Sequence, residues 1–114
     1  MSKSKNLPDS DRLLVEKNKL AAYLLNLSHK DGASKAKFFI KRGFKPDQLE
    51  IFAKALQTHG ASQTVTGIEK TRHGKKFTVE CHIKTPDGKD PCILSVWIQE
   101  KGKPLRLITA HPNS

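Results

Sequence analysis

The spacing of hydrophobic residues changes once along the chain, close to Ser62, and this change limits the possible folds. Before that point, apolar residues recur every three or four positions, as they do along one side of an α-helix. After it, they recur at every second position, as on a half-buried β-strand, and turns containing Gly or Pro separate the runs. The sequence therefore predicts an α+β fold in which three N-terminal helices precede a four-stranded antiparallel β-meander and pack on one face of the sheet.

Three segments of the N-terminal half have helical spacing. The first is expected to begin at Asn18 as N-cap, the second to end before a left-handed Gly43, and the third to run from Pro46, near its first turn, to a stop at Gly60. Their apolar stripes consist, in order, of Leu20, Tyr23, Leu24 and Leu27; of Ala36, Phe39 and Ile40; and of Leu49, Phe52, Ala53 and Leu56. Residues 13–15 are a short apolar run that suits either an edge strand or a hydrophobic staple for the first helix.

Four strands are expected in the C-terminal half, at residues 63–71, 75–84, 92–100 and 105–110, with His111 at the end of the last and Pro112 stopping it. In the second strand, one face consists of Phe77, Val79, Cys81 and Ile83, and the other of Lys76, Thr78, Glu80, His82 and Lys84. A sheet covered by helices on one side leaves the polar face open.

The length of 114 residues suits a single domain, expected at residues 7–114 behind a short basic tail at residues 1–6. No apolar run approaches the roughly 20 residues that span a bilayer, and no apolar segment follows the N-terminal lysines, so we expect a cytoplasmic protein without a membrane partner. Cys81 and Cys92 lack the spacing of metal ligands. They are expected to be small buried hydrophobes, because a disulfide would be unusual in a reducing compartment.

The chain carries 21 Lys and Arg against 11 Asp and Glu, a formal net charge of +10. Such a charge attracts nucleic acid, acidic proteins or anionic lipid, but it equally suits a lysine surface that only keeps the protein soluble. The second helical segment concentrates the charge in Lys35, Lys37, Lys41 and Arg42. A helix with one apolar face and several cations can pack on a core and still present positive charge to a polyanion.

The open face of the sheet is one candidate for chemistry. Glu80 or His82 could act as general base toward a ribose 2′-hydroxyl, and Ser95 and Trp97 from the third strand are expected beside them, with Trp97 stacking a base. The alternative is an ordinary polar strand face with Trp97 in the core, and alternation alone favours it.

His29 and Arg106 are candidates of a different kind. His29 lies in a polar loop before Gly32 and Lys35, so the loop and the start of the second helix could hold a phosphate, although a loop histidine is as often a surface residue or a cap. Arg106 has the bidentate fork that suits phosphate, but it could equally pair with a carboxylate. No motif for a metal or another cofactor is present, so an enzyme built from these residues would use metal-free acid-base chemistry.

Several segments resemble a bacterial family known only as a domain of unknown function. The residues that carry the resemblance are Lys19, Leu20, residues 23–26, His29, Gly32, Lys35, Ala36, Phe38, Phe39, Gly43, Phe44, residues 85–88, residues 96–98, Arg106, Leu107, Thr109, Ala110 and Pro112. The order of helices before a meander is also similar to small nuclease toxins such as barnase, colicin D and RelE, which act on RNA without a metal. The resemblance implies that His29, Lys35, Trp97, Arg106 and Thr109 are the positions to test.

The sequence thus favours an RNA-directed protein, expected to be a metal-independent endoribonuclease of toxin type with RNA and a small acidic antitoxin-like protein as partners. The candidate catalytic residues are His29, Lys35, Glu80, His82, Arg106 and Thr109. The candidate nucleic-acid-binding residues are Lys35, Lys37, Lys41, Arg42, Trp97 and Arg106. One alternative is a non-catalytic basic module that binds nucleic acid or an acidic protein, and another is a structural or adaptor domain.

Overall fold

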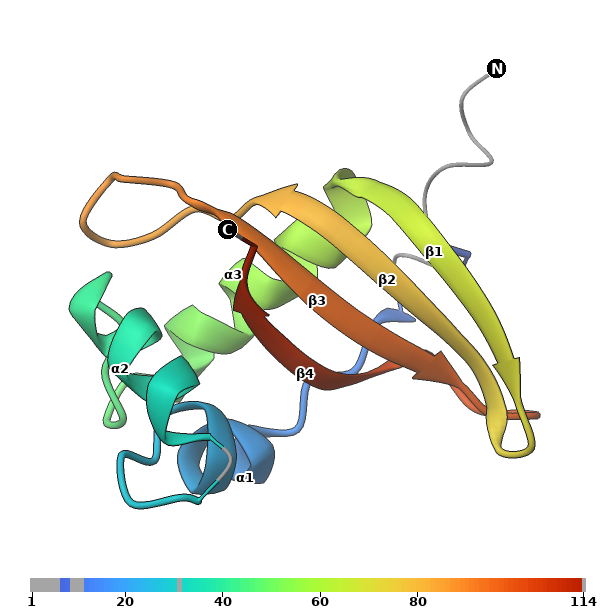
Figure 1. Cartoon of the computed structure of the whole chain (residues 1–114), viewed down its shortest axis with the longest axis horizontal. Helices are drawn as coiled ribbons and strands as arrows, with labels where there is room; N and C mark the ends of the chain where they lie inside the picture. The colour runs from blue at the N-terminus through green and yellow to red at the C-terminus, as the bar shows by residue number, and fades with distance from the viewer. Residues whose placement is uncertain (1–6, 9–11, 31, 114) are drawn as a thin grey trace.

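An antiparallel sheet with the strand order β1-β2-β3-β4 forms the C-terminal half of the protein (Figure 1). Its strands are β1 (Thr64–Thr71), β2 (Gly74–His82), β3 (Cys92–Gln99) and β4 (Arg106–Pro112). The computed structural model describes residues 7, 8, 12–30 and 32–113, so the expected tail at residues 1–6 lies outside the described part. The α+β class and the four-stranded meander that follows the helices are confirmed.

The two faces of the sheet differ as the alternation in β2 predicts. Phe77 and Val79 are buried on one face, whereas Thr78 and Glu80 lie on the other. The register of β3 corrects one expectation: Val79 pairs with Ser95 and Phe77 pairs with Trp97. Residues that are directly opposite in a sheet share a face, so Ser95 and Trp97 lie on the covered face and not beside Glu80.

Helix α3 (Leu49–Ser62) covers that buried face and lies behind the sheet in Figure 1. It begins three residues after Pro46 and passes through Gly60, so both expected ends are corrected. The residue at this helical position is a glycine because the indole of Trp97 occupies the space that a side chain would need. A Cβ at Gly60 would be 2.6 Å from Trp97 Cζ2. The glycine therefore serves helix-sheet packing and does not end the helix.

The first helical segment is shorter than its apolar spacing predicts, and its second half is more widely wound than an α-helix. It consists of α1 (Lys17–Lys19) and the π-helical turn η3 (Leu20–Leu24), and Asn18 lies within α1 and is not its N-cap. The N–H of Leu25 donates to the carbonyl of Leu20, five residues back, and the segment ends there. Leu27 is consequently outside the stripe and 59% exposed.

Helix α2 (Ala33–Lys41) agrees with the expected second helix, and Gly43 follows it with a φ of 107°. Its buried residue Phe39 lies against Phe44 and Phe52, with ring centroids 6.2 and 4.9 Å away. This aromatic cluster joins α2 to α3 and thereby fixes α2 at the β4 side of the sheet, where α2 and η3 meet (Figure 1).

The N-terminal segment and the end of the sheet also differ in detail from expectation. Leu14 forms an isolated parallel bridge with Arg106, so residues 13–15 pair with the start of β4, as in the edge-strand alternative. Strand β4 does not end before Pro112, where the sequence predicted its end. Pro112 is the last residue of the strand and pairs with Ile93. Proline is tolerated there because β4 is an edge strand of the sheet.

A disulfide joins Cys81 to Cys92, which corrects the expectation of two separate buried thiols. The two residues lie near the facing ends of β2 and β3, where antiparallel pairing brings the chains together. Spacing in the sequence did not show this contact, because it depends on the register across the loop at residues 83–91.

Removing the disulfide is expected to lower the free energy of unfolding by about 2 to 3 kcal/mol, since the bond closes a loop over a sequence separation of 11 in the unfolded chain. The measurement is urea unfolding of Cys81→Ser/Cys92→Ser against the oxidised wild type. Reducing the wild type should give the same midpoint as the double variant. An unchanged midpoint in both would mean that the disulfide does not stabilise the fold.

Candidate functional site

Side chains from three elements meet where α2 approaches β4: Tyr23 from η3, Lys35 from α2 and Thr109 from β4. The ammonium of Lys35 donates hydrogen bonds to the phenol oxygen of Tyr23 and, at 3.1 Å, to Oγ1 of Thr109. The two hydroxyl oxygens are 3.2 Å apart and share a further hydrogen bond. Three residues that are 12, 74 and 86 positions apart in the sequence thus form one polar cluster, the Tyr23–Lys35–Thr109 cluster.

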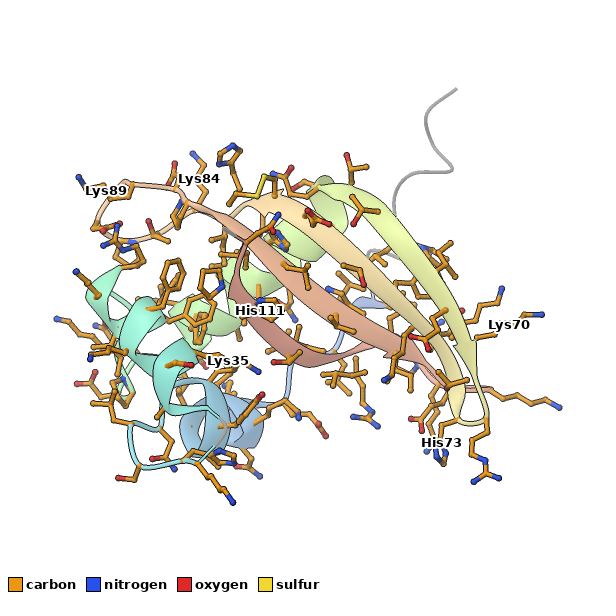
Figure 2. The ribbon with its side chains drawn as sticks, in the orientation of Figure 1. Lys35, Lys70, His73, Lys84, Lys89 and His111 are labelled. Carbon is orange, nitrogen blue, oxygen red and sulfur yellow. A yellow bond between two sulfur atoms is a disulfide. The ribbon has the colours of Figure 1, made fainter. Side chains whose placement is uncertain are left out.

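Close backbone contact holds the cluster together. Gly32, the N-cap of α2, lies so near η3 that a Cβ there would be 2.4 Å from the carbonyl oxygen of Tyr23. Ala36 and Phe39 are fully buried and anchor α2 on the core, while Lys35 is only partly buried. The Lys35 side chain reaches from α2 toward β4, in the same region as His111 and far from Lys70 and His73 at the other end of the sheet (Figure 2).

The electrostatic surroundings favour the ionised form of Tyr23. Partial burial by itself would raise the pKa of the phenol. The hydrogen bonds from Lys35 and Thr109 and the positive charges of Lys35 and Lys19 outweigh it, so the pKa of Tyr23 is below its ordinary value. The ammonium groups also lie over the ring, with Lys35 Nζ 4.8 Å and Lys19 Nζ 5.5 Å from its centroid. The phenolate form of Tyr23 is therefore easier to reach than that of a free tyrosine.

His29 borders this cluster. Its ring lies edge-on to that of Tyr23, with centroids 4.9 Å apart. The backbone N–H of Gly32 donates to His29 Nδ1 at 3.0 Å, which leaves the proton of a neutral imidazole on Nε2. His29 therefore has both of the expected roles of a loop histidine. It orients the start of α2 through the Gly32 N–H, and it lies beside the polar cluster.

Glu80 and His82 lie on the open face of the sheet and are engaged elsewhere. Glu80 accepts hydrogen bonds from Thr66 Oγ1 and Asn113 Nδ2, both at 2.6 Å. His82 Nδ1 lies 2.8 Å from the carbonyl of Asp90, next to the loop that precedes β3. The structure therefore brings Lys35, Thr109 and His29 together but places the other two acid-base candidates in separate interactions.

The remaining cationic candidates divide into paired and exposed side chains. Arg106 donates to Glu100 Oε1 through Nε and Nη2 at 3.4 Å, and Arg42 Nη1 lies 3.4 Å from Asp87 Oδ2. A hydrogen bond from Thr85 lowers the pKa of Asp87, and the charge of Arg42 adds to the effect. Lys37 and Lys41 are exposed on α2, and neither forms an ion pair with a residue that the structure describes.

Trp97 is not available to stack a nucleic-acid base, because it is 0% exposed. Its indole N–H donates to Ser95 Oγ at 2.8 Å, and Ser95 Oγ lies 3.1 Å from His59 Nδ1. His59 is a buried residue inside α3, and its Nε2 lies 3.0 Å from the carbonyl oxygen of Cys81. The interpretation of Trp97 as a core residue is therefore the correct one.

Tyr23 is the site residue that sequence reasoning missed. Its position in an apolar stripe made it a core residue, and its ring does pack against the core while its hydroxyl contacts Lys35. The available signal was the amphipathic nature of tyrosine, whose buried ring usually brings a hydroxyl to a polar partner.

Two absences apply to the part of the chain that the structure describes. Among the described residues, no group of three His, Cys, Asp or Glu side chains could hold a metal ion. Nor does this part of the chain contain a helix of the length and apolarity required to cross a bilayer.

Comparison with known proteins gives one family and one fold. A family model described as a domain of unknown function, DUF6883, matches residues 6–114. A chain from a contact-dependent growth inhibition toxin–immunity protein complex of Klebsiella pneumoniae 342 superimposes with a TM-score of 0.71, covering 87% of this chain and 98% of that chain at 17% identity. No curated protein matches. The structural likeness at this identity shows a shared fold.

Proposed function

We infer that this chain, which belongs to the family described as domain of unknown function DUF6883, is a toxin domain that cleaves RNA without a metal ion. The observation that carries the proposal is the contact of the Lys35 ammonium with both Tyr23 and Thr109. It places a fixed positive charge beside a phenol whose pKa is lowered. A base for the 2′-hydroxyl and a cation for the phosphate both assist attack of a ribose 2′-oxygen on the adjacent phosphate.

The reaction would proceed by transfer of the phosphate to the 2′-oxygen. Tyr23, as phenolate, takes the proton of the 2′-hydroxyl, and the 2′-oxygen bonds to phosphorus. The bond from phosphorus to the 5′-oxygen breaks, and that oxygen takes a proton from a water molecule, whose hydroxide then takes the proton back from Tyr23. Lys35 stabilises the extra negative charge on the phosphate during the transfer. The products are a 2′,3′-cyclic phosphate and a free 5′-hydroxyl.

Three further observations support a toxin. The fold is shared with a chain of a toxin–immunity protein complex. The net charge of +10 suits both RNA and a small acidic inhibitor protein. The Cys81–Cys92 disulfide is typical of proteins that pass through an oxidising compartment, as a toxin does after it leaves the producing cell.

A non-catalytic binding module is the second candidate, and the exposed lysines on α2 favour it. Lys37 and Lys41 project from the helix without an ion pair to any described residue. Such a surface would bind RNA, or an acidic protein, with an affinity that falls steeply with salt.

The test is incubation of the oxidised protein with a labelled RNA oligonucleotide in excess EDTA. We expect fragments that end in cyclic phosphate, and no cleavage where a single 2′-deoxynucleotide replaces the ribose at the cut position. Salt-sensitive binding of intact RNA, without fragments at any pH between about 5 and 9, would reject the ribonuclease in favour of the binding module. Cleavage of the deoxy-substituted strand would reject the 2′-oxygen mechanism.

A further inference from the structure

A cationic hollow lies at the end of the sheet remote from the Tyr23–Lys35–Thr109 cluster. It has a volume of about 630 Å³ and is lined by the turn between β1 and β2, the turn between β3 and β4, and Arg12. Figure 2 shows two residues of this end, Lys70 and His73, across the molecule from Lys35. The charged residues of the hollow are Arg12, Lys70, Lys75, Glu100, Lys101 and Lys103.

The charge of the hollow is almost entirely positive. Its five cationic side chains are exposed, and none forms an ion pair with a described residue. The single carboxylate, Glu100, is already paired with Arg106. Five like charges around a concavity repel one another, so a bound polyanion would relieve an unfavourable arrangement.

Tight turns fix the backbone that carries most of these cations. Thr71 Oγ1 donates to the carbonyl of Gly74 at 2.8 Å, and the N–H of Lys103 donates to the carbonyl of Glu100 at 3.0 Å. The two turns touch: a Cβ at Gly74, where φ is 143°, would be 2.3 Å from the carbonyl oxygen of Gln99. The hollow is therefore built on a fixed backbone, which lowers the entropy cost of binding.

One face of the sheet connects the hollow to the candidate site. Thr109 pairs with Val96 and Arg106 pairs with Ile98. Val96 and Ile98 are two residues apart on β3, so these pairs lie on the same face. Arg106 also contacts Glu100 at the rim of the hollow. A strand of phosphates could follow this face from the hollow to Lys35.

We propose that the hollow binds the backbone of folded RNA while the Tyr23–Lys35–Thr109 cluster acts on a strand of the same molecule; this inference rests on the proposed function. The longest axis of the Cα trace is 35 Å, so an RNA that reaches both places extends over at most on the order of ten base pairs. The preferred substrate is then an RNA with a duplex stem and not a short single strand. The hollow contributes affinity and the cluster contributes chemistry.

The test measures binding and turnover separately in two triple variants with the same change of charge. Lys70→Gln/Lys75→Gln/Lys103→Gln alters the hollow, and Lys54→Gln/Lys84→Gln/Lys89→Gln alters three exposed lysines elsewhere. The probes are a 2′-O-methyl hairpin with a stem of roughly ten base pairs and a 2′-O-methyl tetranucleotide, neither of which can be cleaved.

The hollow variant is expected to bind the hairpin at least about tenfold more weakly at 0.1 M salt, with the slope of log K against log salt smaller by about 2 to 3. Its binding of the tetranucleotide and its kcat on a short cleavable RNA should stay within about twofold of the wild type, as should all values for the matched variant. Equal losses in both triple variants, or no loss in the hollow variant, would overturn the proposal.

Two further outcomes separate this inference from its premise. Loss of hairpin binding in the hollow variant, with no cleavage by the wild type, would retain the RNA-binding hollow and reject the ribonuclease. Loss of binding to poly-glutamate with unchanged hairpin binding would assign the hollow to an acidic protein and overturn the RNA proposal.

Discussion

Replacing Lys35 by alanine is expected to slow RNA cleavage by about 10²- to 10³-fold, because the variant lacks the ammonium that would stabilise charge on the transferred phosphate. The same change removes two hydrogen bonds and the nearby positive charge that lowers the pKa of Tyr23, so the remaining activity should also require a higher pH. The measurement is kcat and KM as a function of pH in EDTA. The loss should appear mainly in kcat.

The matched control is Lys37→Ala, which removes the same charge from an exposed position two residues along α2. Its cleavage rate should stay within a few-fold of the wild type. Tyr23→Phe provides a second comparison, since it keeps the ring against His29 and deletes only the hydroxyl. Full activity in Lys35→Ala, with Lys37→Ala equally active, would exclude the Tyr23–Lys35–Thr109 cluster as the catalytic site.

Acidification from pH 6.5 to pH 4 is expected to lower the free energy of unfolding by about 3 kcal/mol through His59 alone. Burial lowers the pKa of His59 from 6.5 to about 4, although the backbone carbonyls of Cys81 and Ile93 oppose the shift. In this window the unfolded chain binds the proton and the native chain does not, so stability falls as the pH falls. Below about pH 4 both states are protonated and the contribution is constant.

The neutral state of His59 is built into its hydrogen bonds. The carbonyl of Cys81 can only accept, so Nε2 carries the proton and Nδ1 accepts from Ser95, whose oxygen accepts from Trp97. With a second proton on the ring, His59 Nδ1 and Trp97 Nε1 would both be donors directed at the hydroxyl of Ser95. The proton of that hydroxyl would then have lost its acceptor, His59 Nδ1. This arrangement explains why the charged form costs free energy inside the core.

The experiment is urea unfolding between pH 4 and pH 7.5 for the wild type, His59→Asn and His73→Asn. His59→Asn should be less stable at pH 7 and should lose most of the slope between pH 6.5 and pH 4. His73, which is exposed in the turn before Gly74, is the matched control and should leave the slope unchanged. A wild type with no slope in this range would show that His59 does not titrate as its burial implies.

The functional candidates were harder to predict from the sequence than the fold. Lys35 and His29 were chosen for their chemical types and Thr109 through the family resemblance. The structure places the three together, but the residue that joins them, Tyr23, was interpreted as a core residue. Glu80 and His82 were grouped with Trp97 through an assumed register. The loop between β2 and β3 spans residues 83–91, and a connection of that length does not fix the register as a two-residue hairpin does.

The sequence by itself determined the local structure of this protein: the change from helical to alternating spacing, the apolar face of β2 and the turns at Gly43 and Gly88, where φ is positive. These follow from interactions between residues a few positions apart, which the order of residues specifies directly. Only the tertiary structure decided the π-turn at η3, the Cys81–Cys92 disulfide, the burial of Trp97 and the meeting of Tyr23, Lys35 and Thr109. Each depends on how distant segments pack, and a shift of one residue in register would have sent the same side chains to the opposite face.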